Sequence, residues 1–251
     1  MAAKAKYLYG IVENSQFREF GFSGVGDAQV YSINYGDVAA IVSDTEPHEI
    51  DPTRRNVLAH TVVQDRLLKE CTLLPMRFGV IAGSEEEVRR LVEKCYDDIL
   101  SELKRLTGKI EVELKMFWDK RAMVKELEAS SKELRLLRAR ITATSSHAEV
   151  HNLLVRAGQL VERTALSWKT KYAQRVYGIL KQFSIDSRLN KPVGVKNILN
   201  ASFLIDRLKE TEFQQNVRSL DSQCQGRVNF KYVGPLPPYN FVKLNLEPVK
   251  W

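Results

Sequence analysis

The sequence predicts an α+β protein of two domains, each with a mostly antiparallel sheet and packed helices. The chain has 251 residues, enough for two small domains or one large one. Runs with the period-two pattern of strands are interspersed with runs that have helical spacing. Hydrophobic residues make up 44% of the chain, and 13 Gly and 8 Pro are too few for a low-complexity sequence, so we expect a folded core.

The first strands are marked by alternating patterns. Residues 6–12 place aromatic and branched side chains at period two, which is typical of a strand. Residues 29–34 and 37–43 are two further apolar runs, separated by Tyr35-Gly36, which suits a short hairpin turn. We therefore expect these two strands to pair antiparallel. The glycine-rich segment 21–26 lacks the spacing and the following helix of a nucleotide-binding loop, so a flexible loop is expected.

Two helices with a short strand between them complete the N-terminal domain. Asp51-Pro52 is predicted to start the first helix, with Asp as its N-cap. Pro75 makes the apolar run around it an edge strand or an irregular one. Residues 84–87 form a capping box that opens a helix to about residue 106. This order predicts a modified ferredoxin-like sandwich over residues 1–107, with the helices on one face of the sheet.

Residues 108–234 are predicted to form a C-terminal α+β domain with the order β-αα-ββ-α-β. Residues 110–118 alternate apolar and charged side chains, so one strand face is expected in the core and the other in water. Two helices within about 120–183, joined by a short link before Ser146, predict a long antiparallel helical hairpin. The remaining predicted elements are strands at 185–189, 195–205 and 227–233, a helix capped by Asp206, and a Pro-rich extended tail at 235–251.

Charge is divided unevenly along the chain. Residues 1–120 carry 16 Lys and Arg against 20 Asp and Glu, a net −4, whereas residues 121–251 carry 22 against 11, a net +11. An acidic partner, nucleic acid or another copy of the acidic half would each suit the basic half. Solvated helix faces that keep the protein soluble explain the same charge.

Catalytic and metal-binding patterns are nearly absent from the sequence. The closest to a ligand pair is His147 and His151, four residues apart, and a surface role is the simpler interpretation. Three cysteines without CxxC spacing argue against a zinc site or a disulfide framework. Because these patterns are nearly absent, we expect a protein that is not an enzyme and binds no cofactor. No apolar run is long enough to span a membrane, so we expect a cytoplasmic protein.

Three motifs resemble the gas vesicle protein F/L family. They are Tyr7–Val12, Leu74–Gly79 with its Pro-Met-Arg-Phe-Gly core, and Gly234–Val242 with the pattern Gly-Pro-x-Pro-Pro-Tyr-x-Phe. The resemblance implies a non-enzymatic minor structural or accessory protein of gas vesicles. Such a protein would bind the hydrophobic shell protein A, assist nucleation and assembly by preventing its aggregation, and meet other gas vesicle accessory proteins. The alternative, a nucleic-acid-binding or regulatory module that uses the basic half, lacks the RNA-binding motif of ferredoxin-like sheets.

The motif residues are weak candidates for partner contacts. A guanidinium after a short strand suits an internal carboxylate as well as a partner, and we favour the internal role for Arg77. Prolines fix chain direction, and aromatic residues near the end of a chain anchor it onto the body, so folding roles are favoured for the others. The candidates are Arg77, Phe78, Pro237, Pro238, Tyr239 and Phe241.

Overall fold

A computed structural model describes residues 4–13, 19–46, 49–192, 194, 196–224 and 226–244. The chain divides into two compact units. Unit 1 consists of residues 1–112, 204–208 and 234–251, and unit 2 of residues 113–203 and 209–233. Unit 2 is thus inserted into the chain of unit 1. The domain boundaries drawn from the sequence, and the ferredoxin-like comparison, stay predictions.

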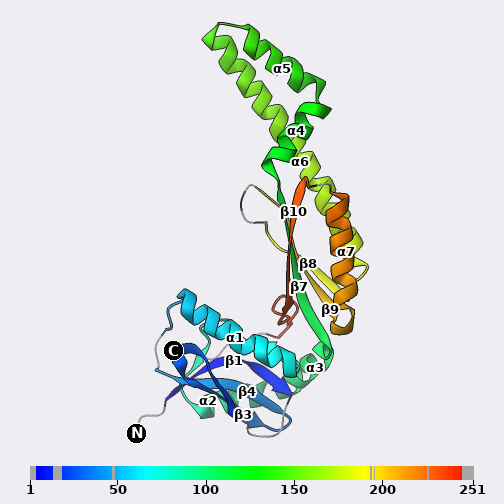
Figure 1. The fold of residues 1–251 in the computed structure, drawn as a ribbon. Coiled ribbons are helices and arrows are strands. Elements are labelled where there is room, and N and C mark those ends of the chain that lie inside the picture. The colour runs from blue at the N-terminus through cyan, green and yellow to red at the C-terminus, as the bar shows by residue number, and fades with distance from the viewer. Residues whose placement is uncertain are drawn as a thin grey trace. The chain divides into compact units, whose positions relative to one another are not determined.

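The helices and strands are mixed along the chain, as predicted for an α+β protein (Figure 1). The elements before residue 107 are β1 (Ala5–Glu13), β2 (Glu19–Ser23), a 3₁₀ turn (Val25–Asp27), β3 (Gln29–Tyr35), β4 (Val38–Thr45), α1 (Arg54–Glu70), β5 (Leu73–Pro75), β6 (Ile81–Ala82), α2 (Glu85–Lys94) and α3 (Tyr96–Leu106). The later elements are β7 (Lys109–Trp118), α4 (Lys120–Ser130), α5 (Lys132–Ala143), α6 (His147–Lys181), β8 (Asp186–Leu189), β9 (Asn197–Asp206), a 3₁₀ turn (Arg207–Lys209), α7 (Glu210–Gln223) and β10 (Val228–Leu236).

Unit 1 is built on a six-stranded sheet. Five strands have the order β2-β3-β4-β1-β5, and the sixth, β6, pairs with a different part of β1 from β5. The predicted hairpin is confirmed, because β3 and β4 pair antiparallel up to the Tyr35–Val38 pair beside the turn. The Pro75 segment lies at the sheet edge, as its missing N–H predicts. One strand was missed: β2 occupies part of the segment expected to be a loop. Its alternating Phe20 and Phe22 were the available signal.

Helices cover both faces of this sheet, so the prediction of helices on one face is wrong. One hydrophobic cluster joins Tyr7, Tyr9 and Ile41 to the α1 residues Val63 and Leu67. A second cluster lies on the other face and joins sheet residues to helices α2 and α3. It includes Leu8, Ile11, Val42, Val88, Val92, Ile99 and Leu103. The uninterrupted apolar run of β4 was the signal, since a strand buried on both faces has no polar alternation.

Several helix boundaries differ from the predicted ones. Helix α1 is capped by Thr53, whose hydroxyl accepts the N–H of Asn56 at 3.3 Å, and not by Asp51. The helix expected to continue to residue 106 is broken at Cys95 into α2 and α3. The helix expected over 120–141 is broken at Ser131, whose hydroxyl caps α5 by accepting the N–H of Leu134. A side-chain cap inside a helical pattern competes with continuation of the helix.

Unit 2 has a four-stranded sheet with the order β10-β7-β9-β8. Phe203 of β9 anchors helices to one face of it. Its ring centroid lies 5.3 Å from that of Phe213 in α7 and 5.8 Å from that of Tyr177 in α6. Asp206 caps the short 3₁₀ turn before α7, at the N–H of Leu208, and so does not cap α7 directly as expected. The predicted strand start at Val195 and tail residues 245–251 lie outside the described residues.

Helices α4, α5 and the first part of α6 form what we call the helical arm, residues 120–166 (Figure 1). Helix α6 has 35 residues, which at 1.5 Å per residue gives a length of about 50 Å. Ser146 caps it by accepting the N–H of Glu149, as the predicted capping box requires. Helix α5 runs back along α6 and packs against it (Figure 1). Leu137 of α5 and Leu153 of α6 are both buried.

The Gly10→Ala substitution is expected to destabilise unit 1. A Cβ at this position of β1 would lie 2.6 Å from the carbonyl oxygen of Leu74 and 2.5 Å from a methyl carbon of Leu73. We expect the free energy of unfolding to fall by about 1–3 kcal/mol, because the neighbouring strand must shift. Urea denaturation measures this, with Arg90→Ala on an exposed position of α2 as the control, expected within about 0.5 kcal/mol of the parent protein.

Candidate functional site

The C-terminal motif is part of unit 1 and packs into its core. Pro237 and Pro238 are buried, and the carbonyl of Pro238 accepts the N–H groups of Phe241 and Val242 at 3.0 and 3.1 Å. Phe241 is 5% exposed and belongs to the hydrophobic cluster that contains Ile99 of α3. The motif therefore folds as a turn that inserts an aromatic ring into the core.

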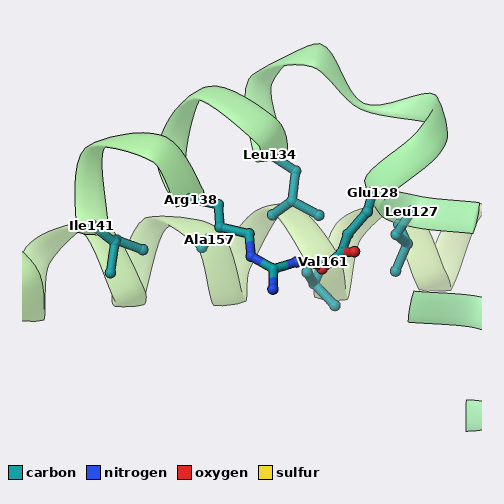
Figure 2. A pocket seen from close by; sticks show the side chains of 7 residues that line it. All are labelled: Leu127, Glu128, Leu134, Arg138, Ile141, Ala157 and Val161. Carbon is teal, nitrogen blue, oxygen red and sulfur yellow. Dashed lines mark hydrogen bonds and ion pairs between the residues drawn. The ribbon is translucent and has the colours of Figure 1, made fainter. Parts of the chain in front are cut away.

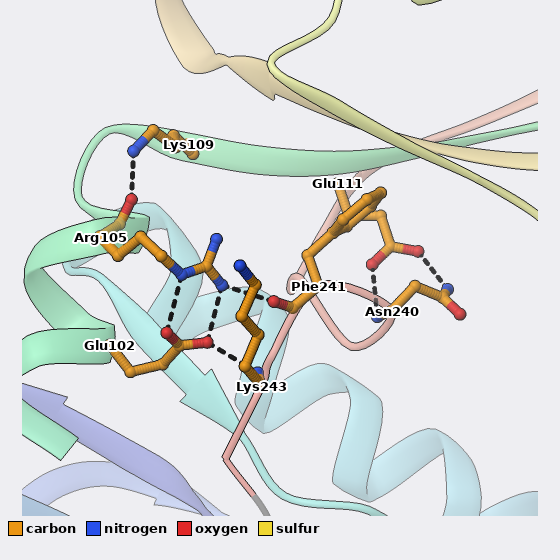
Figure 3. Close-up of polar contacts among 7 residues, drawn as sticks. All are labelled: Glu102, Arg105, Lys109, Glu111, Asn240, Phe241 and Lys243. Carbon is orange, nitrogen blue, oxygen red and sulfur yellow. Dashed lines mark hydrogen bonds and ion pairs between the residues drawn. The ribbon is translucent and has the colours of Figure 1, made fainter. Parts of the chain in front are cut away.

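Two buried carboxylates hold this segment (Figure 3). Glu111 is 1% exposed and accepts the backbone N–H of Asn240 at 2.9 Å and its side-chain amide at 2.5 Å. Glu102 accepts the N–H of Lys243 at 2.8 Å and two hydrogen bonds from the Arg105 guanidinium, from Nε and from Nη2, each at 2.7 Å. Arg105 also donates to the carbonyl of Phe241. We call Glu102, Arg105, Glu111 and residues 240–243 the C-terminal clasp.

The chemistry of the clasp is electrostatic. The hydrogen bonds and charge of Arg105, together with the N–H of Lys243, hold the pKa of Glu102 below its ordinary value despite burial. Glu111 lies on the strand face that the charge alternation assigned to water, and that assignment is wrong for this residue. The alternation gives the period of the strand, but a covering segment 129 residues later along the chain is not visible in it.

A second polar cluster joins the central and C-terminal motifs. His60 of α1 is 3% exposed; its Nδ1 lies 2.9 Å from the Tyr7 hydroxyl and its Nε2 lies 3.2 Å from the Met76 carbonyl. The Tyr239 hydroxyl lies 3.4 Å from the same Nε2 and donates to the side-chain carbonyl of Gln64. Both imidazole nitrogens are therefore engaged. Burial lowers the pKa of His60 to about 4, so the ring is neutral at neutral pH.

The structure brings two of the candidate residues to this His60 cluster and leaves one apart. The ring of Phe78 lies 5.8 Å from that of His60, centroid to centroid, and the hydroxyl of Tyr239 reaches the same imidazole. Arg77 is exposed, and among the residues that the structure describes it has no ion pair. An ion pair between Arg77 and a carboxylate of the same chain was expected, and none is found among those residues. A contact between Arg77 and a partner protein stays a prediction.

Neither cluster has the form of an active site or a metal centre. Within the described ranges, no three His, Cys, Asp or Glu side chains gather as metal ligands. His147 and His151 are both exposed on α6. Over the same ranges, no helix is long and apolar enough to cross a membrane.

An apolar groove lies on the helical arm (Figure 2). Its volume is about 210 Å³, and helices α4, α5 and α6 all contribute to it. The charged side chains at the groove are Arg138 and Glu128, which form an ion pair between α5 and α4. The lining residues are Leu127, Glu128, Leu134, Arg138, Ile141, Ala157 and Val161. In the sequence, the seven-residue spacing of Leu127, Leu134 and Ile141 was the signal for an apolar seam.

Comparison with known proteins identifies the family. The model of the family described as gas vesicle synthesis protein GvpL/GvpF matches residues 5–243. Gas vesicle protein F of a Nostoc species is 28% identical over 95% of this chain and 98% of its own, and gas vesicle protein F1 of Halobacterium salinarum is 25% identical over 96% and 93%. The crystal structure of GvpF from Anabaena superposes with a TM-score of 0.80 at 27% identity, covering 97% of this chain and all of that one.

The chain is therefore an α+β protein with two antiparallel sheets and the fold of solved gas vesicle proteins. The chain belongs to the gas vesicle synthesis protein GvpL/GvpF family. Its relatives carry the names of gas vesicle proteins, which supports an accessory role in gas vesicles and association with their components.

The His60 cluster predicts a pH-dependent stability. The ordinary pKa of histidine is 6.5 and the folded value is about 4, so between these values the unfolded chain binds more protons than the folded one. The free energy of unfolding is therefore highest above pH 6.5 and falls as the pH drops toward 4, by on the order of 3 kcal/mol. Urea titrations from pH 7 to 5 should show this fall in the parent protein and a flatter profile in His60→Gln. The exposed His147→Gln control should keep the parent slope; an unchanged slope in His60→Gln would contradict the assignment.

The clasp predicts that a charge at position 240 is poorly tolerated. Asn240→Asp replaces the amide donor to Glu111 with a second carboxylate of nearly equal size. We expect a loss of at least about 1–3 kcal/mol at pH 7, because a buried acceptor loses its donor and gains a repelling charge. Denaturation of Asn152→Asp, at an exposed position of α6, gives the matched control and should differ from the parent by less than about 0.5 kcal/mol. Equal effects of the two variants would refute the clasp.

Proposed function

We propose that this protein is a non-enzymatic accessory or minor structural protein of gas vesicles that binds the hydrophobic shell protein A. In this role it assists nucleation and assembly of the vesicle by preventing aggregation of the shell subunit. The observation that carries the proposal is the family match across residues 5–243, which spans both units.

The physical requirement of the role supports the proposal. A subunit that assembles into a water-excluding wall exposes apolar surface and strand edges before assembly, and such surfaces aggregate unless another protein covers them. The arm groove of about 210 Å³ offers apolar side chains to such a surface. Burial of apolar area on both partners would favour such a contact.

The alternative of a nucleic-acid-binding module has less support. Such modules combine basic side chains with exposed aromatic rings on which bases stack. The groove is lined by aliphatic side chains and one ion pair, with no aromatic ring, and the arginines of the arm are distributed over several helices. Nothing seen in the described part of the chain favours catalysis, and the proposed role requires none.

Capture of purified shell protein A by the full chain tests the proposal. Because apolar burial dominates the proposed contact, we expect capture at both low and high salt, and less light scattering when shell protein A is diluted from denaturant in its presence. Nucleic-acid binding would instead weaken steeply as salt rises. Absence of capture and unchanged scattering would overturn the proposal, and salt-sensitive retention of RNA or DNA would replace it with the alternative.

A further inference from the structure

The helical arm has an incomplete apolar seam. Leu137 of α5 and Leu153 of α6 are buried, but the groove residues Leu134, Ile141 and Val161 remain partly open to water. Leu154, three residues before the groove residue Ala157 and on the same side of α6, is 54% exposed. Packed helices present such a seam to a further helix, whose side chains fill the spaces between theirs.

The size and lining of the groove indicate the kind of occupant. Its volume of about 210 Å³ is below the roughly 300–1,000 Å³ of typical small-molecule pockets. A few aliphatic side chains would fill it. Amphipathic helices bind such grooves through apolar residues three or four positions apart, whereas nucleic acid has no matching apolar stripe.

Charge distinguishes between a second copy of the arm and a different partner. Residues 120–166 carry 9 Lys and Arg against 5 Asp and Glu, a net +4. Two arms packed on each other would bring like charges together, which disfavours self-association. A partner helix with acidic flanks would complement the same surface.

The ion pair at the groove indicates where an acidic side chain of the partner helix would bind. Figure 2 shows the Arg138 side chain extending across the groove toward Glu128. The side chains of Arg138 and Glu128 are 67% and 39% exposed, so the pair is a surface ion pair of small net stability. A carboxylate on an incoming helix can therefore exchange with Glu128 at little expense to the fold.

We propose that the arm groove binds an amphipathic α-helix of a partner protein. The apolar stripe of this helix fills the seam, and a carboxylate on its acidic flank replaces Glu128 as the ion-pair partner of Arg138. This inference deepens the proposed function, since it names the kind of segment by which the partner is held. The apolar stripe supplies most of the affinity, and the acidic flank sets orientation and association rate.

Two synthetic helices test the inference directly on the full chain. Both carry the same leucine stripe; one has glutamate flanks and the other lysine flanks. We expect fluorescence anisotropy to show binding of the glutamate helix and at least about tenfold weaker binding of the lysine helix. No binding of either helix, or equal binding of both, would overturn the inference.

Two substitutions with opposite expected effects place the contact. Glu128→Gln frees Arg138 and should tighten binding of the glutamate helix about threefold to tenfold, whereas Arg138→Gln should weaken it by a similar factor. Glu162→Gln and Arg163→Gln make the same changes on exposed positions of α6 that do not line the groove, and should leave affinity unchanged.

A third substitution tests the apolar seam. Ala157→Glu, which puts a charge into the seam, should abolish binding, while Gln159→Glu two residues later should not. Equal effects of groove and control variants would refute the site.

The same variants separate this inference from the proposed function. If shell protein A is captured equally by the parent and by Ala157→Glu, the proposed function stands and the groove is not its site. If the glutamate helix binds as described but shell protein A is not captured, the groove is confirmed as a helix-binding site and the proposed function fails.

Discussion

Two buried carboxylates, those of Glu102 and Glu111, set the condition on which unit 1 depends. A carboxylate removed from water is stable only when hydrogen-bond donors surround it. Here the backbone N–H groups of Lys243 and Asn240 supply part of those donors, and both belong to the last described residues of the chain. Phe241, between them in the sequence, fills space in the core beside α3. The core of unit 1 is therefore complete only when the C-terminal segment has returned to it.

The return of the C-terminal segment to unit 1 fits the way the two units alternate along the chain. Residues 113–203 and 209–233 leave unit 1 and form unit 2, and the residues between and after them belong to unit 1 again. The chain therefore passes between the two units several times, and the clasp residues 240–243 follow its last return to unit 1. Unit 1 is held by buried hydrogen bonds and by two hydrophobic clusters, one on each face of its sheet. The apolar groove is elsewhere, on the helical arm of unit 2, where side chains remain available to a partner.

Local patterns predicted most elements, and contacts between distant residues account for the differences. The hairpin at Gly36 and the helix caps at Ser84 and Ser146 depend on neighbours a few residues away, and each is present. The burial of Glu111 depends on Asn240 and was not predictable from its strand. The covering of both sheet faces was visible in the apolar run of β4 but requires knowing that α1 packs opposite α2 and α3. The motifs of the candidate residues identified the family, whereas the groove residues Leu134 and Ile141 became a site only when α5 was placed against α6.

Amide hydrogen exchange of Asn240 and Lys243 tests the central claim most directly. If the clasp is part of the cooperative core, these two amides exchange only when unit 1 unfolds, as slowly as amides of the central strand β1. Glu111→Gln should then accelerate exchange at Asn240 and, through loss of stability, in β1 as well. Exchange of both amides at the rate of exposed loops, while β1 remains protected, would show that the C-terminal segment is not needed for the core and would contradict the account.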